Sequence, residues 1–312
     1  MTPIQETLRF APVGDKAVTA VFGDTIDPAI NRRIRHTVQA LQTEVGHTIE
    51  EMVSTYSSIL VIYDPLKKDY DAICDMISAA SQTENETAAA DKVRVVEIPT
   101  VYGGEYGMDM DFVAEHAGLT ASEVINIHSG TDYLVYMLGF IPGFTYLGGM
   151  DERIATPRLT TPRTLIPAGS VGIAGAQTGM YPSDSPGGWQ IIGRTPVRLY
   201  DGNSEKPTLL EAGDYVRYVP VSEEEFLDIK AHLATYEVKS FYCKESELMV
   251  DNTFTKNGAA HAFHLIGNPH SGVSPIAYWQ IEQPGFFTTV QDGGRAGYQQ
   301  YGMPVAGAMD LE

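Results

Sequence analysis

The sequence predicts an α+β fold in which a small mixed unit precedes a β-barrel or β-sandwich. Up to about residue 82, stretches with helical spacing alternate with extended stretches. The segment "SQTENETAAADK" at 81–92 is polar, small and without periodicity, which indicates a boundary between two units. After it, many short extended runs are broken by glycine and proline, a pattern typical of a barrel or sandwich and not of a βαβ sheet.

Residues 1–92 are predicted to form the small N-terminal α+β domain. "TLRFAPVGDKAVTAVFG" reads as two short strands around a turn at Gly14 and Asp15. The pair Asp27-Pro28 then opens a helix, because proline suits the first helical position and the next apolar residues follow at helical spacing. "TIEEMVSTYSSILVIYDP" returns to extended structure and "KKDYDAICDMISAAS" to a helix. The expected order is strand pair, helix, strand pair, helix.

Residues 93–235 are predicted to form the barrel. "KVRVVEIPTVYG" begins it as a strand, two short helical segments follow, and Thr120 with Glu123 fits a capping box. "TDYLVYMLGF" then opens the run of strands that continues through "DYVRYVPV". After a helix at "SEEEFLDIKAHLATYE" the pattern is irregular until a strand and new glycine turns start near residue 277. We therefore expect residues 236–312 to hold a linker and the start of a further, incomplete domain.

Composition narrows the class of protein. The 312 residues carry a net charge of −19, which argues against a nucleic-acid partner because phosphate binding needs a basic face. The two cysteines, Cys74 and Cys243, lie far apart and indicate neither a disulfide framework nor a zinc site. No apolar run approaches the ~20 residues of a membrane span, and "MTPIQETLRF" lacks the features of a signal peptide. The sequence therefore predicts a cytoplasmic protein without a membrane partner.

The stretch 139–196 is dense in glycine and proline and also carries aromatic residues and arginines. Such a mixture predicts shaped loops, since glycine admits unusual torsions and proline fixes φ. Arg158 and Arg163 each directly follow a proline, and "AGSVGIAGAQTG" offers backbone N–H groups, so the stretch suits a phosphate or carboxylate. Neither a P-loop nor a GxGxxG entering a helix is present. Tight turns between strands explain the glycines equally well, and Arg194 fits a structural ion pair as well as a site.

The other candidate residues each have two interpretations. His128 is either a general acid–base, because imidazole titrates near neutral pH, or a helix C-terminal residue that interacts with the helix dipole. Gln177 and Thr178 suit a substrate amide or carboxylate, but turn amides also bind backbone. Tyr133 and the other aromatic residues are more often core than substrate platforms. Asp184 is a turn cap or a metal ligand, the cap being favoured.

Two segments carry a family resemblance. His128 and Tyr133 precede "MLGFIPGFTYLGG" and "TPRLTTPRTLIPAGSVGIAGAQTGMYPSDSPGGWQIIGRTPVRL", and together these residues closely resemble the family of the 5-oxoprolinase B subunit, also described as the Kip inhibitor of a sporulation sensor kinase and as allophanate hydrolase subunit 1. The resemblance covers roughly residues 5–235. "IEQPGFFTTVQDGGRAGYQQYGMPVAGAMD" separately resembles the opening of the 5-oxoprolinase C subunit, the Kip antagonist or allophanate hydrolase subunit 2. The chain thus looks like the B subunit fused to the beginning of the C subunit.

The resemblance implies a cyclophilin-like barrel for residues 93–235 and a site shared with the C subunit. It also implies ATP-dependent opening of the 5-oxo-L-proline lactam to L-glutamate, with ATP and Mg²⁺ as cofactors, the C and A subunits of 5-oxoprolinase as partners, and no activity without them. The sequence shows no dedicated carboxylate cluster, and we predict no metal ligands. Catalytic roles fall to His128 and Arg158. The residues expected to bind substrate or phosphate are Tyr133, Arg163, Gly169, Ser170, Gln177 and Thr178.

Two other functions stay open. The first is a regulatory protein that inhibits a sensor histidine kinase, and the second is a carboxyltransferase-like domain related to urea carboxylase, which would need a biotin carrier that this sequence lacks. The joint presence of His128, Arg158 and a glycine-shaped cleft favours an enzyme. The apolar residues of 280–310 further predict that this segment packs on the barrel or pairs two chains into a homo-oligomer.

Overall fold

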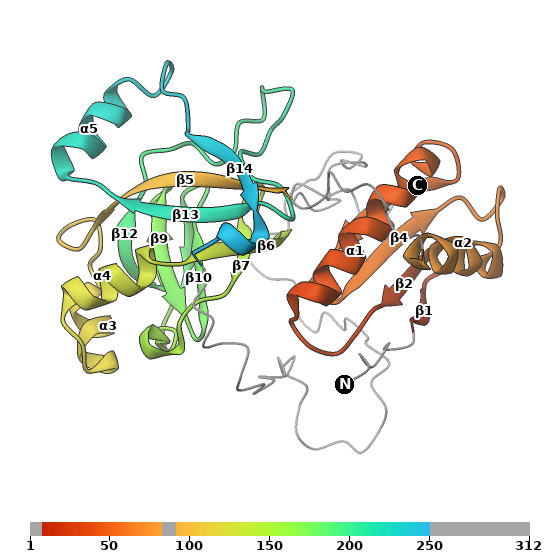
Figure 1. Ribbon diagram of the computed structural model, residues 1–312, viewed down its shortest axis with the longest axis horizontal. Helices are drawn as coiled ribbons and strands as arrows, with labels where there is room; N and C mark the ends of the chain where they lie inside the picture. Colours follow the sequence, from red (N-terminus) through yellow and green to blue (C-terminus); the bar gives the residue numbers. More distant parts are fainter. Residues whose placement is uncertain (1–7, 83–91, 250–312) are drawn as a thin grey trace.

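The computed structural model describes residues 8–82 and 92–249, and these residues form two large sheets with their helices and a small two-stranded sheet (Figure 1). The first sheet is antiparallel with the order β1-β2-β4-β3. Two helices, α1 and α2, pack side by side against it. The elements are β1 (Arg9–Val13), β2 (Ala17–Val21), α1 (Pro28–Leu41), β3 (Ile49–Ser54), β4 (Ser58–Tyr63) and α2 (Tyr70–Gln82). Their order is the one that the sequence predicts.

Helix α1 begins where the Asp27-Pro28 pair predicts. The Asp27 carboxylate accepts a hydrogen bond from the Ala29 amide at 2.6 Å, and Pro28 occupies the first turn, where a missing N–H removes no helical bond. Ile34 and Leu41 are buried one above the other along the helix face that covers the sheet. Burying two such side chains contributes about 1.5–3 kcal/mol each, so this face fixes α1 on the sheet.

The second sheet curls into a nearly closed barrel. Its strand order is β10-β9-β12-β5-β13-β6-β7, and β7 lies beside β10 across the closure. Strand β13 runs parallel to β5, and the other pairs are antiparallel. The strands are β5 (Lys92–Tyr102), β6 (Asp132–Leu138), β7 (Thr145–Gly148), β9 (Ser170–Ala174), β10 (Gln177–Met180), β12 (Gln190–Arg194) and β13 (Tyr215–Pro220). The predicted α+β class with a β-barrel is confirmed.

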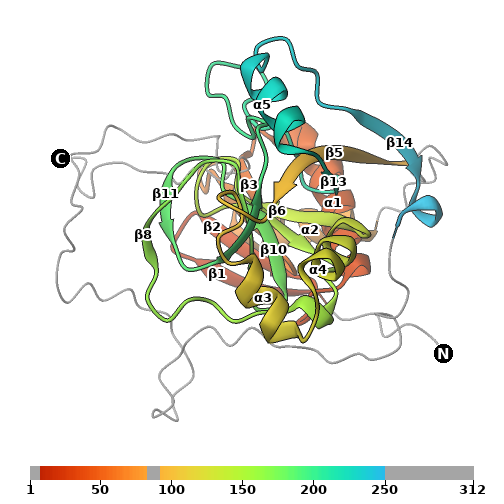
Figure 2. The ribbon, with the colours of Figure 1, turned by 90° about the vertical axis from the view of Figure 1, so that its left-hand side faces the viewer.

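Three helices and a short ribbon surround the barrel. Helices α3 (Met110–Ala117) and α4 (Ala121–Ser129) lie on one side, and α5 (Glu223–Ala231) lies on the opposite side (Figure 2). The capping box predicted from Thr120 and Glu123 is present at the start of α4. Strands β8 (Arg163–Ile166) and β11 (Ser185–Gly187) form a separate two-stranded ribbon. No helix within the described residues is both long and apolar enough to cross a membrane.

Strand β14 (Ser240–Lys244) was not expected, because the sequence pattern after residue 235 looks irregular. It pairs antiparallel with β5, and the Glu97 amide donates a hydrogen bond to the Lys239 carbonyl just before it. Because most of its five residues are exposed, β14 has no alternation of apolar and polar side chains that the sequence could show. It forms by pairing with β5, which lies far away in the sequence. The predicted start of a further domain, with its association of two chains, lies outside the described residues.

Helix α1 also joins the two sheet units. The fully buried Asn31 side chain donates to the Tyr136 carbonyl at 3.3 Å, and Arg32 forms an ion pair with Glu245 at 2.6 Å. Arg35 packs so closely on Gly213 that a Cβ there would lie 2.5 Å from its Nη1 atom. Because these contacts come from successive turns of α1, the helix faces the first sheet on one side and the barrel on the other.

The loop before β9 shows why the glycine-proline stretch is built as it is. Gly169 has φ +81°, and a Cβ at this position would lie 2.2 Å from the Thr195 carbonyl oxygen. The preceding amide, of Ala168, donates to Asp184 at 2.7 Å, and the Ala168 carbonyl accepts from Arg194 at 2.9 Å. Asp184 thus accepts from the backbone of a second loop, 16 residues away in sequence, and this contact is neither the local turn cap nor the metal ligand considered from the sequence. The Arg194 Nε atom donates to backbone and not to a carboxylate.

We expect Gly169→Ala to lower the free energy of unfolding by about 1–3 kcal/mol, because alanine disfavours positive φ and its Cβ would meet backbone. Gly188→Ala is the matched control, since a Cβ there finds its nearest neighbour at 3.6 Å and the backbone lies outside the left-handed region. Its expected effect is within about 0.5 kcal/mol. Chemical denaturation measures both, and equal stability of the two variants would show that this loop tolerates a side chain.

Candidate functional site

The structure distributes the predicted site residues over four places and does not gather them into one cleft. Some lie inside the barrel, one forms an ion pair, two lie toward the outside, and two shape a loop. In that order they are His128, Tyr133 and Thr178; Arg163; Arg158 and Gln177; and Gly169 and Ser170. Each group has its own chemistry.

The interior group is centred on His128, in the last turn of α4. Its side chain is 0% exposed. The Nδ1 atom lies 2.8 Å from the Tyr102 hydroxyl and the Nε2 atom 2.7 Å from the Thr178 hydroxyl. The Tyr133 hydroxyl donates to the His128 carbonyl at 2.7 Å, and the Tyr218 ring packs 4.4 Å from the imidazole. The imidazole therefore joins α4 to β5 and β10 through the core of the barrel.

The proton positions in this group follow from its hydrogen bonds. Burial lowers the pKa of His128 to about 3, so the imidazole is neutral at pH 7 and has one donor and one acceptor nitrogen. The Thr178 hydroxyl donates its one proton to the Gly172 carbonyl at 3.2 Å. Toward His128 the Thr178 oxygen is therefore the acceptor, and Nε2–H is the donor. Nδ1 accordingly accepts from the Tyr102 hydroxyl. Both ring nitrogens are engaged, which leaves neither for proton exchange with a substrate in this arrangement.

Arg163 makes a two-pronged ion pair with Asp109, the residue before α3. Its Nη1 and Nη2 atoms lie 2.9 and 2.7 Å from the two carboxylate oxygens, and Nη1 also donates to the Trp189 carbonyl at 3.3 Å. Asp109 accepts a further hydrogen bond from the Ile191 amide at 2.6 Å. Such forked pairs are among the stronger hydrogen-bonded contacts. The donors of Arg163 thus tie the β8 ribbon to α3 and β12.

Arg158 is different, because it is exposed and makes no ion pair with the described residues. Its guanidinium carbon lies 5.8 Å from the centroid of the Trp189 ring, within range of a cation–π contact. Burial raises the pKa of Tyr146, and it raises the pKa of Tyr181 to about 12. The positive charge of Arg158 acts in the opposite direction and lowers both pKa values. Arg158 is therefore a cation held beside aromatic rings, and within the described part of the chain no carboxylate competes with an anion for its hydrogen-bond donors.

The rings below Arg158 form one aromatic cluster around Phe144. Tyr146, Tyr181 and Trp189 approach the Phe144 ring edge-on, with centroid distances of 5.3, 5.7 and 5.6 Å. Phe140 lies 5.7 Å from the same ring. We call this surface the arginine–aromatic face. At the surface it consists of Phe140, Tyr146 and Arg158, and the Tyr181 and Trp189 rings are buried beneath them.

Phe140 belongs to this face, although the sequence did not identify it as a candidate site residue. Its backbone has φ +68°, the one positive value outside glycine among the described residues, and its ring is 60% exposed. Left-handed torsions disfavour a bulky side chain, so the surrounding turn must hold it in place. The turn does so through hydrogen bonds from the Gly139 amide to the Phe144 carbonyl and from the Phe144 amide to the Ile141 carbonyl. Strain at an exposed ring is typical of a binding surface.

Tyr56 is a second residue that sequence reasoning missed. It belongs to the first sheet unit, yet its hydroxyl accepts a hydrogen bond from Gln177 Nε2 at 2.6 Å. Its ring lies 6.0 Å from that of Tyr146, edge-on. Along β10, Thr178 points into the barrel and Gln177 toward Tyr56, as alternation along a strand requires. The first unit thereby borders the arginine–aromatic face.

The donor sets suit an anion better than a metal. Among residues 8–82 and 92–249, no group of three or more His, Cys, Asp or Glu side chains is arranged to hold a metal ion. Arg158 offers a guanidinium that fits carboxylate or phosphate, and in the same cluster the exposed Phe140 ring and the half-buried Tyr146 ring can cover an apolar ring of a ligand. The face can thus hold a small anionic molecule by charge and by stacking.

Comparison with known proteins identifies the class. Residues 8–210 match the family described as carboxyltransferase domain, subdomain C and D. The B subunit of 5-oxoprolinase from Bacillus subtilis strain 168 is 42% identical over 224 residues, 69% of this chain and 93% of that protein. The Escherichia coli O157:H7 protein of the same name is 40% identical over 211 residues, 68% of this chain and 95% of that protein. The chain belongs to the carboxyltransferase-domain family and, within it, to the family of the 5-oxoprolinase B subunit.

Solved structures agree with the fold. The crystal structure of Kluyveromyces lactis urea amidolyase matches with a TM-score of 0.63 and 21% identity over 78% of this chain and 17% of that one. The protein TTHA0988 matches with a TM-score of 0.59 and 34% identity over 66% of this chain and 40% of that one. The fold of the described residues is thus shared with a part of urea amidolyase and with a part of TTHA0988.

We expect His128 to make stability depend on pH. Its folded pKa of about 3 lies below the unfolded value of about 6.5, so its contribution is present above pH 6.5 and is lost as pH falls toward 3. At pH 4.5 the loss should reach about 2–3 kcal/mol. Denaturation curves at pH 7 and 4.5 test this, with His128→Gln as the variant that keeps hydrogen bonding without a titrating group. The wild type should lose more stability than the variant, and an equal loss would contradict a neutral buried imidazole.

Proposed function

We propose that this chain is one component of an ATP-dependent 5-oxoprolinase, which opens the lactam of 5-oxo-L-proline to L-glutamate. The observation that carries the proposal is the 42% identity across 93% of the B subunit of the Bacillus subtilis 5-oxoprolinase. Because that match spans nearly the whole relative, it supports the same role as a component of a hydrolase complex. The arginine–aromatic face is compatible with a small anionic lactam.

The reaction is difficult because amide resonance protects the lactam. ATP would transfer its γ-phosphoryl group to the lactam oxygen, which gives an activated imidate and ADP. One water then adds to the carbon and the C–N bond breaks as the amine takes up a proton, which leaves an acyl phosphate. A second water hydrolyses the acyl phosphate to the carboxylate and inorganic phosphate. The protein contributes chiefly by positioning the reactants and by stabilising charge on the transferred group. In the proposed division of labour, the B and C subunits activate the lactam and the A subunit finishes the hydrolysis.

Arg158 is the residue that we assign to the anion. Its guanidinium can bind the carboxylate of 5-oxoproline or the transferred phosphoryl group, and the exposed Phe140 ring or the half-buried Tyr146 ring can pack on the five-membered ring. We assign His128 a positioning role, because it holds Thr178 and so the strand that carries Gln177. Gly169 and Ser170 shape the adjacent loop.

The cofactor needs more than this part of the chain supplies. ATP with Mg²⁺ would require carboxylate or hydroxyl ligands for the metal and several cations for the triphosphate. The described residues contain no group of carboxylates arranged to hold a metal ion, and the ion pair with Asp109 occupies Arg163. The donor set here does not fit a complete ATP·Mg²⁺ site, and we propose that the C subunit supplies the rest. The chain alone is accordingly expected to be inactive.

The remaining proposals concern assembly and location. The C and A subunits of 5-oxoprolinase are the proposed partners and 5-oxoproline the substrate. The resemblance of residues 281–310, which lie outside the described part, to the opening of the C subunit supports a fusion of the two subunits. Association of two chains through that segment stays a prediction, as does a cytoplasmic location.

Carboxyl transfer is the second candidate function, because the matching family is named for a carboxyltransferase domain. Urea amidolyase of Lachancea kluyveri is 26% identical over 251 residues, which cover 14% of that protein. We rank this function second because the identity is lower than with the 5-oxoprolinase B subunit and the match covers only a small part of urea amidolyase. It would also require a carrier-bound biotin. Inhibition of a sensor kinase stays open as a third function, and no contact among the described residues favours it.

We expect Arg158→Ala to reduce the activity of a complex reconstituted with the A and C subunits by about tenfold or more, since a charge-assisted contact contributes about 1.5–3 kcal/mol. Stability should change little, because Arg158 is exposed and pairs with no described carboxylate. The measurement is ATP-dependent glutamate formation from 5-oxoproline.

Arg198→Ala is the matched control, because Arg198 is also exposed and its ion pair with Asp201 lies outside the face. It should retain wild-type activity. Full activity of Arg158→Ala would remove Arg158 from the site, and substantial turnover by the chain without the A and C subunits would contradict the shared site.

A further inference from the structure

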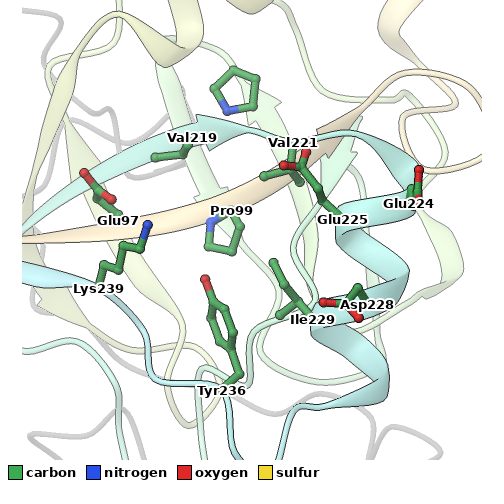
Figure 3. A pocket seen from close by; sticks show the side chains of 11 residues that line it. Glu97, Pro99, Val219, Val221, Glu224, Glu225, Asp228, Ile229, Tyr236 and Lys239 are labelled. Carbon is green, nitrogen blue, oxygen red and sulfur yellow. The ribbon is translucent and has the colours of Figure 1, made fainter.

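A groove lies between α5 and the barrel, apart from the arginine–aromatic face (Figure 3). Its volume is about 550 Å³. Strands β5 and β13 form the floor, α5 forms one wall, and residues 236–239 form the other as they return toward β14. None of these elements carries a residue of the arginine–aromatic face.

The lower part of the groove is apolar. Pro99 and Val219 come from the two strands, Ile229 from α5, and the Tyr236 ring from the opposite wall, where Figure 3 shows its hydroxyl pointing toward Pro99. Helix α5 is held by Phe226, its one buried residue, whose ring packs 4.8 Å from the Tyr106 ring, and by a hydrogen bond from the Tyr106 hydroxyl to Glu223 at 3.1 Å. No side chain within the described residues fills the space between α5 and the floor, so the apolar floor is open to a side chain from elsewhere.

The rim is acidic. Glu97, Glu224 and Asp228 border the opening, and Lys239 is the one cation among the lining residues. Glu224 makes no ion pair with the described residues, and Asp228 contacts only His232 at 3.2 Å. The Tyr236 hydroxyl likewise has no hydrogen-bond partner in residues 8–82 and 92–249. Carboxylates and a hydroxyl around an empty apolar floor leave both polar and apolar binding capacity unused.

We propose that this groove docks a segment of a partner protein of the complex in which an apolar side chain stands next to a lysine or arginine. The apolar side chain would enter between Pro99, Ile229 and Tyr236, and the basic head group would meet Glu224 and Asp228 at the rim. We infer a basic segment from charge complementarity, because an acidic rim repels acidic segments and attracts and orients basic ones. A second copy of this chain is disfavoured because it carries a net charge of −19.

The proposal rests on the proposed function, which requires partner subunits, but it concerns binding and not chemistry. A groove that shares no residue with the arginine–aromatic face can hold an assembly together while leaving the turnover of the assembled complex unchanged. Binding and activity therefore report on different claims, and one preparation can measure both.

The test is the affinity of the purified A and C subunits for the full chain, measured by isothermal titration calorimetry at two salt concentrations. The double variant Glu224→Lys/Asp228→Lys should bind at least one of them about tenfold or more weakly and lose most of the salt dependence. Ile229→Trp, which fills the floor without a change of charge, should weaken binding of the same partner. Glu237→Lys is the matched control, because Glu237 is exposed beside the groove but does not line it, and its affinity should stay within about twofold of wild type.

Circular dichroism melts confirm that each variant is folded before it is compared. Wild-type affinity of both groove variants would overturn the docking proposal, and so would equal weakening by the control. If that result comes with an active wild-type complex, the proposed function stands without the groove. If the wild-type complex forms and releases no glutamate, the proposed function fails, and the affinities still decide the groove.

Discussion

The rest of the structure depends on the imidazole of His128 being neutral and fully paired inside the barrel. It joins the last turn of α4 to Tyr102 at the end of β5 and to Thr178 on β10, and Tyr133 on β6 closes the group from a third strand. A buried polar network stabilises a fold only when every member has a partner, because an unpaired group loses its hydration without replacement. The position of α4 on the barrel and the packing of three strands around it therefore depend on the same few hydrogen bonds.

Strand β10 carries that constraint outward. Thr178 faces the imidazole, and the neighbouring Gln177 faces Tyr56 of the first sheet unit. Tyr56 in turn packs edge-on against Tyr146 in the arginine–aromatic face. Strand β10 thus links the polar interior to the contact between the two units and to the arginine–aromatic face. Hydrogen bonds in the core therefore determine the position of the residues at the surface.

Local signals in the sequence were sufficient for much of the fold. Asp27 and Pro28 mark the start of α1, Thr120 and Glu123 cap α4, and Gly169 has the positive φ that a shaped loop needs. Each of these depends on neighbours within a few residues, which is the range that propensity and capping describe. The class of fold followed because the spacing of glycine and proline between strands is also local.

The candidate site could be predicted only in part, because its contacts join distant residues. Arg158 and Arg163 look alike in sequence, yet Asp109, 54 residues before Arg163, occupies one of them and leaves the other free. Tyr56 meets Gln177 across 121 residues. No sequence motif around Asp109 or Tyr56 predicts these contacts. His128 was found as a candidate, but a nine-residue helix does not show whether its last turn faces solvent or the barrel interior.

The most direct test of this account is an NMR titration of the His128 ring nitrogens in the folded chain. The account predicts a neutral imidazole with the proton on Nε2 and no titration between pH 8 and pH 5, since burial places its pKa at about 3. A His128 that titrates with a midpoint near pH 6.5 would contradict it, because a charged imidazole at that pH requires access to water or to a carboxylate.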